Sequence, residues 1–286
     1  DPAAARFDDG GDEDKKCAEE ECSALLQVRG EGKPAAWRTD DGGRRVACDL
    51  TSNGLEFDSL VQSCSVLAEK DYKFAHEAPV YVPSEDIVVF TSNRLDDVVE
   101  ISKICLKSGK VTRFPDRIWK DEIVMANGGT LDFRPGSPLR CADKAHSVLL
   151  TSQGNLNKSS GIYRLNVRTH AVELVVNTSA WQMQNFNSPN DIVIDPVSGA
   201  VIFTDPVYGY IQDFRPAPSL GNWLWHYMPS GGEEGPGGGP LPKMLADGFQ
   251  RPNGVAFADA TGEKLLVTDT GYALGAESVS WKSLQE

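Results

Sequence analysis

Short apolar runs separated by turn-forming residues dominate the hydrophobic pattern of this chain. Four of these runs end in the same way, with a threonine followed by serine or aspartate; they cover residues 88–92, 148–152, 201–205 and 265–269. Their threonines stand at positions 91, 151, 204 and 268, so the spacings are 60, 53 and 64 residues. A strand-sized unit that recurs at such a period is typical of a repeat architecture, and the period suits a four-stranded blade.

Further strands are predicted on either side of the shared runs. An inner strand precedes three of them, at 78–82, 190–194 and 253–257. Residues 161–167 alternate apolar and polar side chains, as a half-exposed outer strand does. A parallel α/β fold would need an amphipathic helix after each strand, and none is found. We therefore predict an all-β chain that contributes about four blades of a β-propeller.

The composition of the chain limits the classes of molecule that it is expected to bind. The chain has 286 residues, 27 glycines, 17 prolines and 40% hydrophobic residues, which suits a turn-rich β protein with a sizeable core. A net charge of −13 opposes contact with nucleic-acid phosphates or anionic lipid, and no basic stripe is present. No apolar run approaches the roughly 18 residues of a membrane span. We expect neither nucleic acid nor membrane as a partner, and the oligomeric state is left open.

The sequence also predicts the domain organisation and the cellular compartment. Residues 1–70 are predicted to form an acidic leader that contains cysteines, and 71–286 the propeller. Six cysteines without a CxxC pair indicate disulfides, one candidate being Cys105–Cys141, while buried thiols are the alternative. Glycosylation sequons occur at Asn157 and Asn177. Together these features predict a secreted glycoprotein.

The residues that carry candidate chemistry stand at the starts of the inner strands. Glu77, Asn190 and Asn253 occupy equivalent places there, and such positions converge in a propeller. Carboxylate and amide oxygens are the ligands that calcium takes, and no histidine or cysteine joins them to suggest zinc or copper. Asn127, in Asn127-Gly128-Gly129, begins the second repeat and is predicted to face substrate, with a plain glycine turn as the alternative.

Several other residues have simpler interpretations. A Pro-Asn-Gly or Pro-Asn-Asp triplet taken alone indicates a turn. His76 adjoins Glu77 and could act as an acid or base, but a neighbour on a strand points to the opposite face. His146 precedes an apolar run and is expected to pack, as are Trp223 and Trp225.

Three motifs, in this order, resemble the gluconolactonase, regucalcin and fungal lactonohydrolase superfamily, the SMP-30-like propellers. They are HEAPVY at 76–81, SPND at 188–191 with FTDPVYG at 203–209, and RPNGVAF at 251–257. The resemblance covers roughly residues 74–275. It implies a six-bladed propeller with a calcium ion at its axis. It also implies hydrolysis of lactones, and of organophosphates in some relatives.

The resemblance also implies roles for particular residues. Glu77, Asn190 and Asn253 match three of the four ligands of the family. The fourth, an aspartate that is also the expected general base or nucleophile, would fall one repeat further on, beyond Glu286. Six blades of this length need about 350 residues. We therefore expect a site without its catalytic residue here, weak calcium binding and poor turnover.

Three functions follow as hypotheses. The first is a calcium-dependent hydrolase of small-molecule lactones, in which the metal polarises the lactone carbonyl. The second is a propeller that binds without turnover, and the third is a metal-dependent phosphotriesterase. Another divalent cation could replace calcium in either enzyme.

Overall fold

The computed structural model describes residues 67–133, 145–179, 183–229, 240–258, 260–271 and, for the backbone alone, 280–284. Nearly all of the predicted leader lies outside these ranges, as does most of the glycine-rich segment 231–240. Among the cysteines only Cys105 is described, and it is half-buried, so the pairing with Cys141 stays a prediction.

The described strands form four antiparallel sheets, each built from strands that follow one another in the chain. Blade 1 contains β1 (Glu77–Val82), β2 (Ile87–Thr91), β3 (Ile101–Cys105) and β4 (Val111–Arg113); blade 2 contains β5 (Ala126–Leu131), β6 (Ser147–Ser152), β7 (Gly161–Asn166) and β8 (Val172–Val176); blade 3 contains β9 (Ile192–Ile194), β10 (Val201–Asp205), β11 (Trp223–Tyr227) and β12 (Lys243–Ala246); blade 4 contains β13 (Pro252–Phe257), β14 (Leu265–Asp269) and β15 (Ser280–Leu284). The all-β prediction and the four blades are confirmed, and the alternative α/β fold is excluded because the strands of every sheet pair antiparallel.

The four shared runs of the sequence are the second strands of the blades, β2, β6, β10 and β14. In β6 and β10 the side chains alternate between two cores, because successive residues of a strand point to opposite faces. Val148 and Leu150 of β6 pack between blades 1 and 2, while Leu149 packs between blades 2 and 3. Phe203 and Ile202 of β10 divide in the same way between the second core and the third. The strands β6 and β10 are apolar on both faces because each face is covered by a neighbouring blade. In β2 and β14 one face lies in a core, with Ile87 and Val89 in the first and Leu265 and Val267 in the third.

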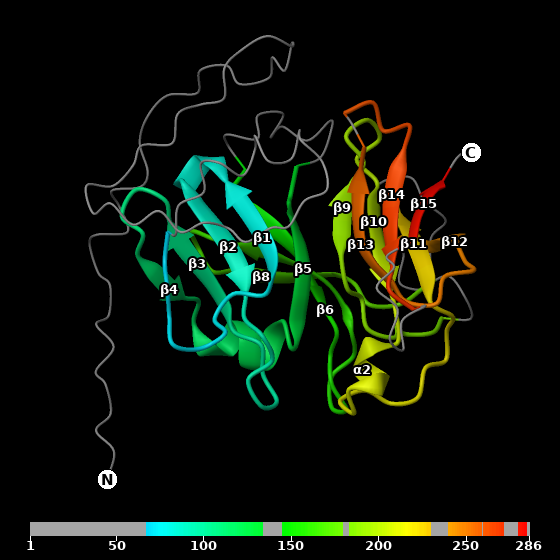
Figure 1. The fold of residues 1–286 in the computed structure, drawn as a ribbon, viewed down its shortest axis with the longest axis horizontal. Coiled ribbons are helices and arrows are strands. Elements are labelled where there is room, and N and C mark those ends of the chain that lie inside the picture. The colour runs from blue at the N-terminus through cyan, green and yellow to red at the C-terminus, as the bar shows by residue number, and fades with distance from the viewer. Residues whose placement is uncertain are drawn as a thin grey trace.

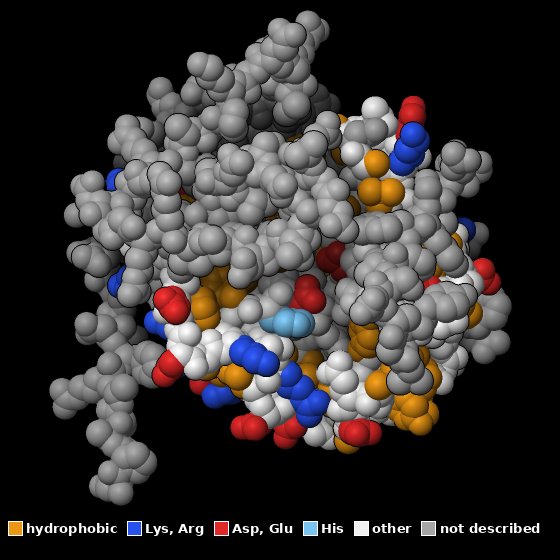
Figure 2. Space-filling model, in the orientation of Figure 1, with side chains coloured by type: hydrophobic (Ala, Val, Ile, Leu, Met, Phe, Trp, Pro, Cys, Tyr) orange, Lys and Arg blue, Asp and Glu red, His pale blue; other side chains and the backbone are white. Residues whose placement is uncertain are grey.

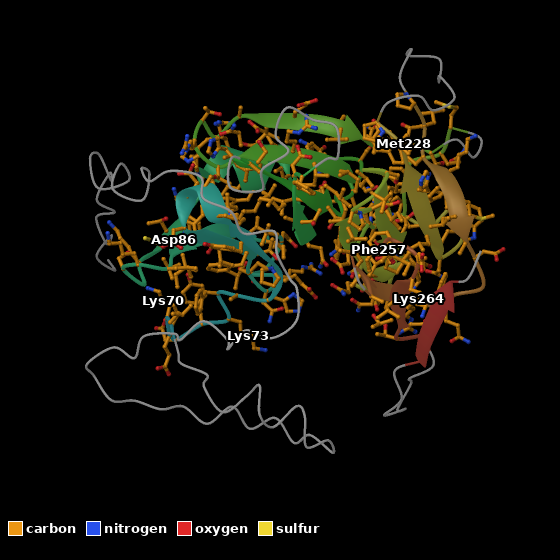
Figure 3. The ribbon with its side chains drawn as sticks, turned by 90° about the horizontal axis from the view of Figure 1, so that it is seen from above. Lys70, Lys73, Asp86, Met228, Phe257 and Lys264 are labelled. Atoms are coloured by element: carbon orange, nitrogen blue, oxygen red, sulfur yellow. The ribbon has the colours of Figure 1, made fainter. Side chains whose placement is uncertain are left out.

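The blades follow one another around an arc. In Figure 1 blades 1 and 2 lie on one side and blades 3 and 4 on the other, with β5 and β9 facing each other in the middle. Seen from above, Asp86 of blade 1 and Lys264 of blade 4 lie on the two opposite arms of this arc (Figure 3). The inner strand β1 contacts β5, β5 contacts β9, and β9 contacts β13. The starts of the inner strands are therefore neighbours in space as well as repeats in sequence.

Helical structure is sparse in the described ranges. There is a 3₁₀ turn at Pro83–Glu85, a π-helical turn at Ile118–Glu122 and the short helix α2 at Tyr208–Ile211. No described helix combines the length and the apolar character that crossing a membrane requires.

Two local expectations were wrong. The glycine turn considered at Asn127-Gly128-Gly129 is part of the inner strand β5. His146 does not pack among apolar side chains, because its Nδ1 lies 2.6 Å from Ser84 Oγ and 3.0 Å from Glu85 Oε1. Burial is the main reason that the pKa of His146 is lowered, and the charge of Arg168 adds to this effect. Trp225 is buried as predicted, at 1% exposure.

Candidate functional site

Each inner strand of blades 1, 2 and 4 begins with the same irregularity in its pairing. The register shifts between Glu77 and Val80 in β1, between Ala126 and Gly129 in β5, and between Pro252 and Val255 in β13. Beyond the shift, Val80, Thr130 and Ala256 each pair with the residue two positions before the threonine of the shared strand. Glu77, Asn127 and Asn253 lie three residues before these and so occupy one position.

Asn190 belongs to the same set. The N–H of the residue that follows it, Asp191, donates to Thr204 Oγ1, just as Gly254 N–H donates to Thr268 Oγ1. Four successive blades therefore place an oxygen-bearing side chain at one equivalent point. Asn127, predicted to contact substrate, shares the position of the three predicted metal ligands.

The threonines of the sequence repeat hold these residues in place from the preceding blade. Thr91 Oγ1 donates to Asn127 O at 3.2 Å, and Thr151 Oγ1 donates to Asn190 O at 2.7 Å. Thr204 Oγ1 donates to Asn253 O at 2.7 Å. The threonine that marks each repeat therefore joins its own blade to the start of the next inner strand.

The four side chains differ in burial and in partners. Asn190 is 5% exposed, while the Glu77 side chain is 37% exposed and its Oε1 lies 3.8 Å from His76 Nδ1. Asn127 Oδ1 is buried and has no hydrogen-bond partner among the described residues. The Asn253 amide nitrogen donates to Tyr208 Oη at 3.1 Å. A buried amide oxygen without a donor is the kind of group that a cation would satisfy.

Blades 2 and 3 approach closely at these starts. Gly128 N–H donates to Asn190 O at 2.7 Å. A Cβ on Gly128 would lie 2.5 Å from Asn190 O and 2.6 Å from Asp191 Oδ1, so no other residue fits without a shift of the backbone. This contact requires Gly128, one of the two glycines because of which β5 was not predicted as a strand.

Asp191 is a carboxylate that sequence reasoning treated only as part of a motif. Its Oδ1 accepts from Ile192 N–H and its Oδ2 from Val255 N–H, both at 2.9 Å, so it ties blade 3 to blade 4. Burial raises the pKa of Asp191 to about 6, with a smaller contribution from the negative charge of Glu77 and against the effect of the two backbone donors. The charge of Glu77, two repeats away, contributes to this rise, so the starts of blades 1 and 3 lie within electrostatic range of each other. The signal that could have found Asp191 is the charged residue at a position where blade 2 and blade 4 have glycine.

The aspartates that end two shared strands have a structural role. Asp205 is fully buried and accepts from the backbone N–H groups of Asn187 and Ser188 and from Trp225 Nε1. Asp269 accepts in the same way from Gln250 and Arg251 N–H. Burial raises the pKa of Asp205 to about 7, although its hydrogen-bond donors and the charge of Arg215 oppose the rise. These carboxylates shape the loops that lead into the inner strands.

The residues at the strand starts fit a hard divalent cation. Their donors are one carboxylate and three amides, and oxygen donors of this kind are what calcium takes. Nowhere in the described ranges do three His, Cys, Asp or Glu side chains gather as metal ligands. Figure 2 shows acidic side chains beside a histidine near the middle of the described surface.

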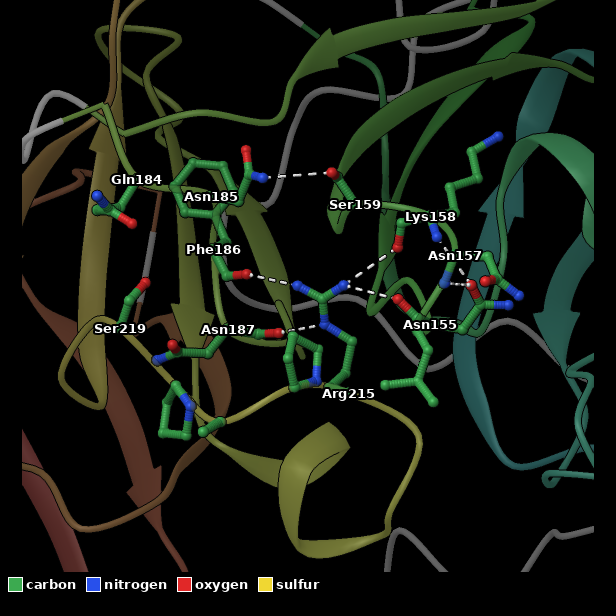
Figure 4. A pocket seen from close by; sticks show the side chains of 14 residues that line it. Asn155, Asn157, Lys158, Ser159, Gln184, Asn185, Phe186, Asn187, Arg215 and Ser219 are labelled. Atoms are coloured by element: carbon green, nitrogen blue, oxygen red, sulfur yellow. Dashed lines mark hydrogen bonds between the residues drawn. The ribbon is translucent and has the colours of Figure 1, made fainter.

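A separate pocket of about 290 Å³ lies between blades 2 and 3 (Figure 4). Arg215 fills its floor and donates to the carbonyl oxygens of Asn155, Lys158, Phe186 and Asn187. Burial lowers the pKa of Arg215, and the charge of Asp205 opposes this effect. Because its donors are used on backbone oxygens, Arg215 acts as a bridge between two blades.

No family model matches the chain, and no curated protein matches it. Among solved structures, the luciferin-regenerating enzyme is 15% identical with a TM-score of 0.43, over 74% of this chain and 62% of that one. TolB from Acinetobacter baumannii is 14% identical with a TM-score of 0.44, over 72% and 40%. The PQQ-bound aldose sugar dehydrogenase from Streptomyces coelicolor is 16% identical with a TM-score of 0.43, over 75% and 62%.

The chain therefore spans between 40% and 62% of the length of these three proteins. They include enzymes and also TolB, and a likeness at this level carries no argument about function. The fold rests on the sheets themselves, which are propeller blades.

Proposed function

We propose that the starts of the inner strands hold a divalent cation, calcium in the first instance, and that they form the metal-binding part of a site that hydrolyses lactones. One observation carries the proposal: Glu77, Asn127, Asn190 and Asn253 present oxygen atoms from the same position of four successive blades. The buried Asn127 Oδ1, which has no donor among the described residues, supports it. The resemblance of three motifs to the gluconolactonase superfamily supplies the substrate class.

The residues of the proposed site would have the following roles. Glu77 contributes the only charge of the set, so a divalent cation held by it and the three amides would keep a net positive charge. When bound, the cation would supply Lewis acidity toward a lactone carbonyl. Asn190 and the Oδ1 atom of Asn127 are buried, and the strand starts would fix the position of the donors.

Calcium titration of the protein tests the metal site. Glu77→Gln keeps the shape of the side chain but removes its charge, and should lower calcium affinity at least about tenfold. Glu263→Gln, on an exposed turn of blade 4, is the matched control and should leave the affinity unchanged. Thermal unfolding with and without calcium gives an independent reading, because a ligand of the folded state raises the melting temperature.

A panel of lactones and phosphotriesters, with calcium or with a chelator, tests the chemistry. Calcium-dependent turnover of lactones supports the proposal, and preference for phosphotriesters would replace the substrate class. Calcium binding without turnover of either would indicate a propeller that only binds. Neither binding nor stabilisation by any divalent cation would overturn the metal site.

A further inference from the structure

A long connection in blade 3 passes over the starts of the inner strands. We call this segment, residues 206–222 between β10 and β11, the strap; it contains helix α2 (Tyr208–Ile211). Near its start, Ser188 Oγ donates to Pro206 O at 2.5 Å and accepts from Gly209 N–H at 3.0 Å. The strap is therefore fixed to the loop that carries Asn190.

The middle of the strap, just after helix α2, reaches blade 1. Arg94 Nη1 donates to Gln212 O at 2.9 Å, and the Arg94 guanidinium lies 5.1 Å from the centre of the Phe214 ring. Phe214 in turn is buried in the core between blades 1 and 2. Attachment at both ends holds helix α2, and with it Tyr208, at a defined place.

Tyr208 takes part in a chain of hydrogen bonds that ends on a backbone carbonyl. Asn253 Nδ2 lies 3.1 Å from Tyr208 Oη, and Tyr208 Oη is hydrogen-bonded to Thr270 Oγ1. Thr270 Oγ1 lies 3.4 Å from Arg251 O, which also accepts from Thr270 N–H at 3.1 Å.

The carbonyl at the end sets the direction of the whole chain. Arg251 O, a carbonyl oxygen, can only accept, and we assign to it the single hydroxyl proton of Thr270. Thr270 must then accept from Tyr208, whose own proton is used on this bond. Tyr208 Oη is left as an acceptor toward Asn253, and only the amide nitrogen of Asn253 can satisfy it.

We propose that Tyr208 is a positioning residue: together with Thr270 it fixes the Asn253 amide with its nitrogen toward the strap, leaving Oδ1 free for the other strand starts. The use of that oxygen as a ligand rests on the proposed function, whereas the fixed orientation does not. Partners of this kind, behind a metal ligand, orient the ligand and tune its affinity.

The test compares Tyr208→Phe with Tyr210→Phe. Both changes remove one hydroxyl from the same short helix, but Tyr210 is 50% exposed. Urea unfolding of each variant shows that it folds. The first reading is the side-chain amide resonance pair of Asn253 in the metal-free protein, which should shift and exchange faster with solvent in Tyr208→Phe alone.

The second reading is calcium affinity. Tyr208→Phe should lower it about 10- to 100-fold, while Tyr210→Phe should leave it unchanged. In an Asn253→Asp background the loss caused by Tyr208→Phe should largely disappear, because a carboxylate presents an oxygen in either orientation. A general structural defect would weaken both backgrounds alike.

An unchanged Asn253 amide signal in Tyr208→Phe would overturn the proposal. So would an equal loss of calcium affinity in the Asn253→Asp background. If the native protein binds no cation, the proposed function fails, and the amide resonances alone then decide whether Tyr208 sets the orientation.

Discussion

Replacing Thr204 with valine should destabilise the protein although the two side chains have nearly the same shape. Thr204 is fully buried at the junction of blades 3 and 4. Its Oγ1 donates to Asn253 O at 2.7 Å and accepts from Asp191 N–H at 3.0 Å. Valine puts a methyl group at that place, which can neither donate nor accept.

The size of the effect follows from these two bonds. A hydrogen bond contributes about 0.5–1.5 kcal/mol net, and a buried donor left without an acceptor costs about 1–3 kcal/mol. Losing both bonds and leaving the Asp191 N–H without its partner should lower the free energy of unfolding by about 2–4 kcal/mol. Thr204→Ser keeps the hydroxyl and loses one methyl group, so it should cost about 1 kcal/mol.

Urea denaturation of the two variants and the native protein measures the expected order of stability, in which the native protein is the most stable and Thr204→Val the least. The midpoint should fall further for valine than for serine, with an unchanged dependence on urea concentration. If packing rather than hydrogen bonding held the junction, valine would be nearly neutral and serine the more damaging change. That reversed order would refute the reasoning.

Two further predictions concern Asp205 and the sequons. Asp205→Asn should cost about 1–3 kcal/mol relative to the exposed Asp97→Asn, because an amide would turn an N–H group toward the backbone donors of Asn187 or Ser188. Burial raises the pKa of Asp205 to about 7, so the unfolded chain loses this proton first. Stability should therefore fall as pH rises from about 4 to about 7 and level off above, and this slope should be smaller in Asp205→Asn. Protein from a secreting host should carry sugar at the exposed Asn157 rather than at Asn177, which is half-buried and followed by the fully buried Ser179; mass spectrometry that finds no glycan and six free thiols would contradict the secretion hypothesis.

The strands were largely predictable because the shared runs are short and apolar, and in β6 and β10 both faces are covered. The predicted runs 201–205 and 265–269 coincide with β10 and β14, and 148–152 differs from β6 by one residue. The inner strand β5 was missed because two glycines lower its strand propensity. Their reason lies in the contact of Gly128 with blade 3, which no local pattern reveals.

The candidate site was predictable in position and less so in its surroundings. Repetition alone placed Glu77, Asn190 and Asn253 at equivalent points, whereas the equivalence of Asn127 needed the register of β5 and β6. The strap was missed because its contacts with Arg94 and Thr270 join residues more than 60 positions apart. Its one sequence signal was length, since 17 residues between β10 and β11 exceed what a simple hairpin needs.

The threonine repeat links the stability of the fold to the geometry of the site. Thr91, Thr151 and Thr204 bind the backbone carbonyls of Asn127, Asn190 and Asn253, whose side chains form most of the candidate metal set. A single blade therefore cannot position its own ligand, because the donor that fixes it belongs to the preceding blade. Any loosening between blades should displace a ligand before it unfolds a strand.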